Sequence, residues 1–252
     1  MRPGASDPTA ASDSSVLRFR AVLGAGLAAL EAHREEVNEL NVFPVPDGDT
    51  GDNMVLTLRA VLDELDRLAV AAPGAGIDQI SRDEIVSSVA RAALLGARGT
   101  SGVILSQLIR GAAEELASRP GELVDPVLIS AALARAVDQA YGSVREPVEG
   151  TILTVAREMG VQIASDLARM REARLPADAS AEVQNLVIAK LVERALEAGE
   201  ASLARGPDRL PALRRAGVVD AGGYALTLVF AGIVVWSFAH GEAAVQPPGL
   251  RA

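Results

Sequence analysis

The segment best equipped for chemistry runs from Asn41 to Met54 and reads NVFPVPDGDTGDNM. Its three carboxylates, on Asp47, Asp49 and Asp52, fall within six residues of one another. Carboxylates this close repel one another unless a cation lies among them, and their oxygens suit a hard cation, Mg²⁺ before Mn²⁺ or Ca²⁺. The alternative interpretation is a solvated acidic turn, because aspartate and glycine also favour turns.

Three features of this acidic segment favour a metal site. Pro44 and Pro46 stiffen the approach to the aspartates, which would preorganise ligands. Gly48 and Gly51 allow the backbone to come close to a ligand. The segment also leads directly into the start of a predicted helix near Asp52, where free backbone amides attract phosphate.

Three further glycine-rich segments each lead into a predicted helix. They read GARGTSG at 96–102, EPVEGTIL at 146–153 and GVVDAGG at 217–223. Any one of them alone is well explained as a helix–helix turn. Three such starts together with the aspartate cluster at a fourth indicate that these helix ends converge on a polyphosphate with metal ions.

The elements that must position these segments are helices nearly throughout. Apolar residues recur at helical spacing, as in Val16, Phe19, Leu23, Leu27 and Leu30, and we found no run with the alternation of a strand. The eight predicted helices cover residues 15–40, a stretch after 52, 81–96, a stretch from 101, a stretch from 126, 151–171, a stretch after 180 and a stretch after 223. We therefore predict an all-α fold.

The predicted domain is a single one, from residue 15 to residue 240, with a disordered tail over 1–14 and a flexible tail over 241–252. One segment, 221–239, has no charged residue and is long enough to span a membrane. It opens with two glycines, contains Thr227 and Ser237, and has no lysine or arginine directly after it. We expect a buried core helix and no membrane role.

The composition excludes several other kinds of site. The chain of 252 residues has no cysteine, which excludes disulfides, thiolate metal sites and cysteine nucleophiles. Its single lysine, Lys190, lies outside any GxxxxGK[ST] sequence, so there is no Walker loop. A net charge of −9 and an aromatic content of 3% argue against nucleic-acid binding. Any anion bound here is expected to bring its own cations.

Four motifs together resemble one family. The segment 41–54 resembles the NVFPVPDGDTGxNM signature of the nucleotide-binding domain of bacterial fatty acid kinases, which is similar to the ATP-binding L subunit of dihydroxyacetone kinases. ARGTSGVILSQ at 97–107, EPVEGTILTVARE at 146–158 and AGVVDAGG at 216–223 match the same family in the same order. The resemblance covers about residues 15–239.

This resemblance implies a barrel of eight antiparallel α-helices, of the dihydroxyacetone kinase L-subunit type, with the nucleotide at one end. Family aspartates bind two Mg²⁺ ions that bridge the ATP phosphates, so Asp47 and Asp49 are the expected metal ligands and catalytic residues, with Asn41 as a weaker ligand. The other residues that the resemblance places around ATP are Thr50, Gly51, Asp52, Asn53, Thr100 and Ser101 along the phosphates, Ile152 and Leu153 near the adenine, and Asp220 and Gly222, which close the site.

The activity implied by the resemblance is phosphoryl transfer from ATP to a fatty acid carboxylate, giving an acyl phosphate, with the fatty acid presented by a separate carrier protein. Such a transfer depends on positioning and charge neutralisation and needs no covalent nucleophile. Two alternatives stay open: an ATP-binding or regulatory module without turnover of its own, and an L-type subunit of a dihydroxyacetone-like kinase. We expect a cytoplasmic protein, because residues 1–14 lack the apolar stretch of a signal peptide. The resemblance leaves the oligomeric state open, since the family often dimerises through its other domains.

The chain also departs from the family pattern. Asp52 replaces the usual threonine, and Thr100 replaces the usual asparagine. A carboxylate at position 52 would add negative charge near the phosphates unless it joined the metal ligands. Family fatty acid kinases carry further domains after this one, and at 252 residues this chain spans only the nucleotide-binding part of such an enzyme.

Overall fold

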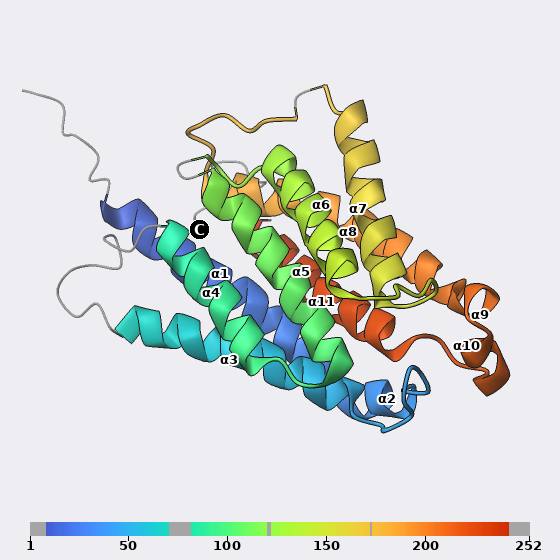
Figure 1. Cartoon of the computed structure of the whole chain (residues 1–252). Coiled ribbons are helices and arrows are strands. Elements are labelled where there is room, and N and C mark those ends of the chain that lie inside the picture. The colour runs from blue at the N-terminus through green and yellow to red at the C-terminus, as the bar shows by residue number, and fades with distance from the viewer. Residues whose placement is uncertain (1–8, 71–81, 120–121, 172, 242–252) are drawn as a thin grey trace, which may run out of the picture.

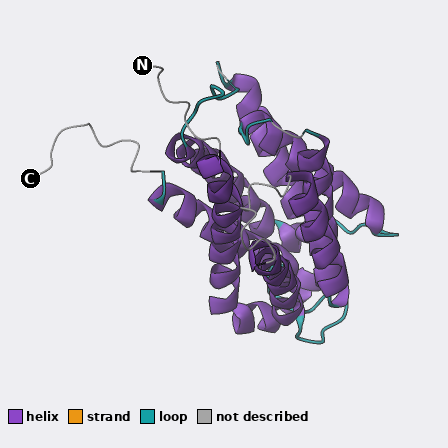
Figure 2. Cartoon of the chain, turned by 90° about the vertical axis from the view of Figure 1, so that its left-hand side faces the viewer, coloured by secondary structure: helices purple, strands orange, loops and turns teal. Residues whose placement is uncertain are grey.

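The computed structural model describes residues 9–70, 82–119, 122–171 and 173–241. Over these ranges the chain forms eleven helices and no strand, which confirms the all-α prediction (Figures 1 and 2). The eight long helices are α1 (Thr9–Ala32), α3 (Thr50–Val70), α4 (Arg82–Gly96), α5 (Gly99–Ser118), α6 (Pro126–Ser143), α7 (Ile152–Arg169), α8 (Ala181–Ala204) and α11 (Ala221–Ala239). The three short ones are α2 (Arg34–Glu39), α9 (Gly206–Arg209) and α10 (Pro211–Ala216).

The eight long helices form a closed ring. Each long helix contacts the next long helix along the chain, and α11 contacts α1, which closes the barrel. Consecutive members run in opposite directions, so the starts of α3, α5, α7 and α11 lie toward the same end, at the lower right of Figure 1. This arrangement is the predicted eight-helix antiparallel barrel.

The first predicted helix differs most from the structure. Helix α1 begins at Thr9, earlier than the predicted residue 15, and the chain breaks at His33 before α2 instead of continuing to residue 40. At the break the amide of His33 bonds to the carbonyl of Leu30, one residue closer than in an α-helix. The predicted tails fall largely on residues 1–8 and 242–252, which lie outside the described residues.

Local caps explain why several helices begin where they do. Asp125 accepts a hydrogen bond from the amide of Leu128 at 2.9 Å and precedes Pro126, as the sequence predicts for α6. Ser180 accepts from the amide of Val183 at the start of α8. Helix α11 begins earlier than predicted, directly after Asp220, because that side chain caps it.

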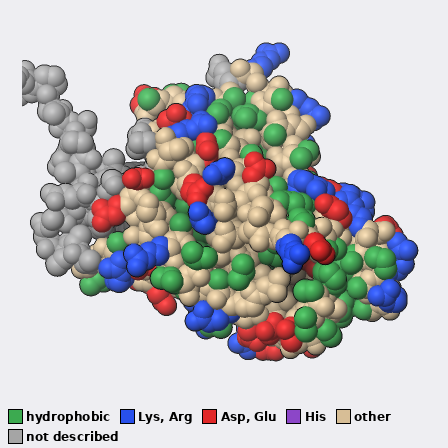
Figure 3. Space-filling view, in the orientation of Figure 1, with side chains coloured by type: hydrophobic (Ala, Val, Ile, Leu, Met, Phe, Trp, Pro, Cys, Tyr) green, Lys and Arg blue, Asp and Glu red, His purple; other side chains and the backbone are tan. Residues whose placement is uncertain are grey.

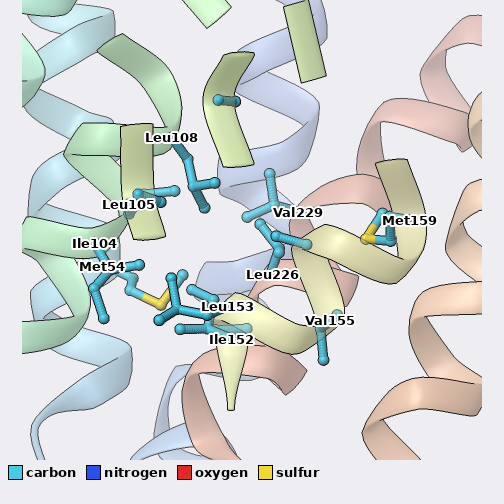
Figure 4. Packing of buried hydrophobic residues seen from close by; sticks show 14 of the residues in the cluster. Met54, Ile104, Leu105, Leu108, Ile152, Leu153, Val155, Met159, Leu226 and Val229 are labelled. Atoms are coloured by element: carbon cyan, nitrogen blue, oxygen red, sulfur yellow. The ribbon is translucent and has the colours of Figure 1, made fainter. Parts of the chain in front are cut away.

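The core of the barrel is a large cluster of aliphatic residues contributed by seven of the long helices together with Val37 of α2. Figure 4 shows Met54 of α3 and Ile104 of α5 close to Ile152 and Leu153 of α7, at the end where these helices start. Each of these four side chains is at most 8% exposed. The helix starts are therefore fixed against one another by buried apolar contacts.

The junction that closes the ring is a direct backbone contact between α1 and α11. A Cβ atom added at Gly232 would overlap the carbonyl oxygen of Ala25, so only glycine fits this crossing. Among the described helices, α11 alone is long and apolar enough to cross a membrane, and 56% of its most apolar window is buried. Because α11 packs on α1, α7 and α8, it serves here as a core helix.

The outer surface carries charged side chains of both signs, interspersed over the face seen in Figure 3. Several pairs link neighbouring helices, such as Arg194 of α8 with Asp166 of α7 at 2.7 Å. Exposed pairs of this kind contribute little stability each, typically about 0.2–1 kcal/mol. The barrel is therefore held by its core and by close helix contacts.

Candidate nucleotide site at the convergent helix starts

A cavity of about 370 Å³ opens where four long helices begin. Its wall is made by the acidic segment before α3 and by the first residues of α5, α7 and α11. Ten of the predicted site residues line it: Asn41, Asp47, Asp49, Thr50, Thr100, Ser101, Ile152, Leu153, Asp220 and Gly222. Four helix starts and residues far apart in sequence thus meet at one place, as the spacing predicted.

The acidic segment forms the first wall. Asn41 is buried, and its Nδ2 donates to Oδ1 of Asp47 at 2.7 Å. Gly48 has φ +69°, a left-handed conformation that glycine adopts without strain, so the chain turns sharply between the two aspartates. The carbonyl of Asp49 then accepts the hydrogen bond from the amide of Asn53, which begins α3.

The start of α5 forms the second wall and has no side-chain cap. Arg98 occupies the N-cap position but makes no side-chain hydrogen bond to the helix. Ser101 donates through Oγ to Oγ1 of Thr50 at 3.4 Å, which joins the starts of α5 and α3. The first amides of α5 are therefore left without a side-chain acceptor, which is the usual arrangement of a helix that binds an anion.

Asn53 lies directly behind this helix start. It is 7% exposed, and its Nδ2 is one of two buried side-chain nitrogen or oxygen atoms without a hydrogen-bond partner in the described part of the chain. Gly99 has φ +59°, and a Cβ atom there would overlap Nδ2 of Asn53. A buried donor without a partner is costly, and this one lies behind Gly99, outside the lining of the cavity.

The third and fourth walls are the starts of α7 and α11. Thr151 precedes α7 without a side-chain cap, and Ile152 and Leu153 present an apolar surface that is almost fully buried. Asp220 caps α11 by accepting from the amide of Gly223 at 2.8 Å. Burial raises the pKa of Asp220 to about 6, although hydrogen bonds from the amides of Gly223 and Ile152 lower it in part.

Charge in the cavity is one-sided. Four of the described residues that line it are acidic, Asp47, Asp49, Glu146 and Asp220, and none is lysine or arginine. Within the described ranges no group of three or more histidine, cysteine, aspartate or glutamate side chains is close enough to hold a metal ion by itself. An anion would bind in this cavity more tightly together with cations that share their coordination between the protein and the anion.

Three predicted residues lie beside the cavity and do not line it. Gly51 and Asp52 donate through their amides to Oδ1 of Asn38, at 2.8 and 3.3 Å, and the carboxylate of Asp52 accepts from Nδ2 of Asn38 at 3.0 Å. Arg34 also lies 3.4 Å from that carboxylate. The charge of Asp52 is thus directed toward α2, and Asn53 is the buried side chain behind Gly99.

Sequence reasoning missed several residues of the wall. The lining also includes Phe43, Pro44, Val45, Gly99, Ile104, Val144, Glu146, Val148 and Thr151. Most of them lie inside the recognised motifs, so the motifs marked the right segments but did not single out every residue that lines the cavity. Asn38 lies outside every motif, and its contact with α3 depends on the chain break at His33.

Comparisons with known proteins identify a family model and relatives that this chain matches. The family model described as the DAK2 domain matches residues 44–235. The chain is 37% identical to Protein YloV of Bacillus subtilis and 36% identical to the uncharacterized protein SSP1546 of Staphylococcus saprophyticus, each over 216 residues. These matches cover 86% of this chain and 34% of each relative, so the chain spans about a third of their length.

The fold also matches a solved structure. The crystal structure of the dihydroxyacetone kinase of C. freundii aligns with 94% of this chain and 37% of that chain, with a TM-score of 0.56 and 18% identity. At this identity the likeness concerns the fold, and it confirms the eight-helix barrel type that the motifs predicted.

Proposed function

This chain belongs to the DAK2 domain family and is a nucleotide-binding module of kinase type, and we propose that it binds ATP with Mg²⁺ for phosphoryl transfer to a fatty acid carboxylate. The observation that carries the proposal is the cavity at four convergent helix starts. Its volume of about 370 Å³ lies within the usual range for small-molecule sites. Its polar side, at Thr50, Thr100 and Ser101, suits a triphosphate. Its apolar side, at Ile152 and Leu153, suits a base.

The triphosphate is proposed to lie along the start of α5. The uncapped amides there, the hydroxyls of Thr100 and Ser101, and Thr50 across from them supply donors for phosphate oxygens. Ile152 and Leu153 provide the apolar surface proposed for the adenine.

The side-chain oxygens of Asn41, Asp47 and Asp49 suit Mg²⁺ as ligands. Two carboxylates, on Asp47 and Asp49, and one amide oxygen form an incomplete oxygen set, which suits an ion that also takes oxygens from phosphates and water. Bound Mg²⁺ would neutralise charge on the phosphate oxygens during transfer. Asp47 and Asp49 would orient the ion, and Asp220 and Gly222 would close the opposite side of the cavity.

Gly51, Asp52 and Asn53 are proposed to act from behind the cavity. The carboxylate of Asp52 accepts a hydrogen bond from Asn38 and forms an ion pair with Arg34, so its negative charge is balanced from the side of α2. This arrangement accounts for how the chain tolerates aspartate where the family pattern has threonine.

The acceptor and the partner are finer parts of the proposal. The motif resemblance supports a fatty acid presented by a carrier protein, in the cytoplasm where ATP and Mg²⁺ are supplied. A second candidate is an ATP-binding module without turnover of its own, and the observation that favours it is that the described residues lining the cavity include no lysine or arginine to stabilise a transferring phosphoryl group. The dihydroxyacetone-type alternative draws support from the fold alone.

The direct test is calorimetric titration with ATP and Mg²⁺ of wild type and of the double variant Asp47→Ala/Asp49→Ala. We expect the double variant to lose Mg²⁺-dependent binding. The matched control, Asp63→Ala/Asp138→Ala, makes the same charge change at two exposed positions outside the cavity and should bind as wild type. Equal ATP affinity in the wild type and the double variant would refute the site.

A second assay separates the two candidate functions. ATP consumption is followed with a fatty acid and its carrier protein present. ATP consumption under these conditions, with no other enzyme added, supports the kinase. ATP binding without consumption supports the module.

A further inference from the structure

Asn38 on α2 caps the start of α3 from a neighbouring helix. Its Oδ1 accepts the amides of Gly51 and Asp52, at 2.8 and 3.3 Å, and its Nδ2 donates to Oδ2 of Asp52 at 3.0 Å. One side chain thereby satisfies two of the first-turn amides of α3, a task that normally falls to the residue directly before a helix.

The short helix α2 is pressed against α3 at the same point. A Cβ atom at Gly51 would overlap the carbonyl oxygen of Arg34 and lie 2.9 Å from Oδ1 of Asn38. Val37, next to Asn38, is fully buried in the main core. The position of Asn38 is therefore determined by backbone contact on one side and by core packing on the other.

The acidic loop lies between the two partners of this contact. It leaves α2 just after Asn38, with the amide of Asn41 bonded to the carbonyl of Asn38 at 3.1 Å, and it enters α3 at Gly51. Both ends of the loop that carries Asp47 and Asp49 are thus tied to Asn38. Inside the loop, Asn41 also holds Asp47 by a hydrogen bond.

We propose that Asn38 is a positioning residue, which holds the acidic loop in the shape that binds Mg²⁺ with ATP; this inference rests on the proposed function. The cap by Asn38 also gives the starts of α3 and α5 different roles. The first-turn amides of Gly51, Asp52 and Asn53 are already bonded, the last to the carbonyl of Asp49. Helix α3 therefore organises the loop, and the uncapped start of α5 is left to meet phosphate.

The first test needs no ligand. Amide hydrogen exchange at Gly51 and Asp52 is measured by NMR in wild type and in Asn38→Ala. We expect protection in wild type and exchange faster on the order of tenfold in the variant, the size of one lost helix cap. The control is Asn185→Ala, which removes another partly buried asparagine hydrogen bond, from Nδ2 of Asn185 on α8 to the carbonyl of His240. This variant should leave the amides of Gly51 and Asp52 protected. Unchanged exchange in Asn38→Ala would overturn the cap.

The second test measures how much Mg²⁺ strengthens ATP binding, as the ratio of calorimetric affinities with Mg²⁺ and with EDTA. In Asn38→Ala this ratio should fall on the order of tenfold, while the affinity in EDTA stays as in wild type. A general loss of structure would lower both affinities, and that result, or an unchanged ratio, would overturn the positioning role. Asn185→Ala should keep the wild-type ratio.

An exchanged pair provides the rescue. Asn38→Asp combined with Asp52→Asn reverses donor and acceptor in the 3.0 Å contact and keeps an oxygen for both amides. The pair should recover most of the lost ratio, and a pair no better than Asn38→Ala would count against the proposal. If wild type itself shows no Mg²⁺-dependent binding, the proposed function fails and the positioning role fails with it, while hydrogen exchange still decides the cap.

Discussion

Asp220 offers a sharp test of the electrostatics at the cavity. It is 5% exposed, it caps α11, and the described residues give its carboxylate backbone amides as donors but no cationic partner. Burial raises its pKa from an ordinary value of 3.8 to about 6. The perturbation is Asp220→Asn, which removes the charge but keeps an oxygen that can cap the helix.

The sign follows from proton binding. Between pH 4 and 6 the folded state holds a proton on Asp220 that the unfolded state has lost, so stability falls as the pH rises. The difference between the unfolded pKa of 3.8 and the folded pKa of about 6 corresponds to about 3 kcal/mol of lost folding stability at pH 7. At pH 4 the loss of stability is under about 1 kcal/mol, since this pH is close to the unfolded-state pKa of 3.8 and the unfolded carboxyl is still partly protonated.

The assay is urea unfolding of both proteins from pH 4 to pH 8, without ATP or Mg²⁺. Asp220→Asn should gain stability relative to wild type as the pH rises, by about 2–3 kcal/mol between pH 4 and pH 7, and then level off. Comparing two proteins at each pH cancels the titration of all other groups. A difference that stays constant with pH, or one that shrinks, would refute the account.

The matched control is Asp125→Asn. Asp125 is also a buried N-cap, of α6, but its Oδ2 lies 3.4 Å from a guanidinium nitrogen of Arg174. Removing its charge breaks an ion pair, so this variant should lose stability at neutral pH, the opposite of Asp220→Asn.

Three further predictions test the packing. Gly232→Ala puts a Cβ atom into the backbone of α1 and should destabilise the barrel by about 1–3 kcal/mol in urea unfolding, whereas Gly24→Ala, which meets nothing within 4 Å, should stabilise it by up to about 1 kcal/mol; equal effects would contradict the close crossing. Gly99→Ala should lower the free energy of unfolding by about 1–3 kcal/mol, because φ is +59° and the Cβ atom meets the side-chain amide of Asn53 on α3. It should also weaken ATP binding in the same calorimetric assay, and wild-type affinity would count against the α5 phosphate site. Met159→Ala, at a fully buried position, should lose about 2–5 kcal/mol of unfolding free energy with little change in ATP affinity at temperatures where the variant is folded, and a loss below 1 kcal/mol would mean that the core collapses to fill the space.

The sequence made the helix starts predictable, because their signals are local. Capping residues such as Asp125 and Ser180 act on amides three positions away, and glycine-rich turns mark where one helix ends and the next begins. The convergence of four starts followed from the number of such signals and from the motif order. These local signals predicted an all-α chain of about eight long helices, and the barrel arrangement was implied by the resemblance of the motifs to one family.

The orientation of single side chains was less predictable. Thr50 lines the cavity and Asp52 does not, although both belong to the same motif, because residues two apart on a helix point about 200° apart. Asn38 could not be found from its neighbourhood in sequence. Its role arises from the break at His33, which has neither glycine nor proline to mark it, and from contact with Gly51 across the loop.

The closure of the ring by α1 and α11 bears on how the protein is made. The wall that carries Asp220 and Gly222 lies about 170 positions after Thr50, so at usual elongation rates it leaves the ribosome roughly 9–34 s later. During that interval α1 lacks the backbone contact that Gly232 later makes with Ala25 and Gly26. The acidic loop is thus translated early, but its cavity is completed only when the last long helix docks onto the first.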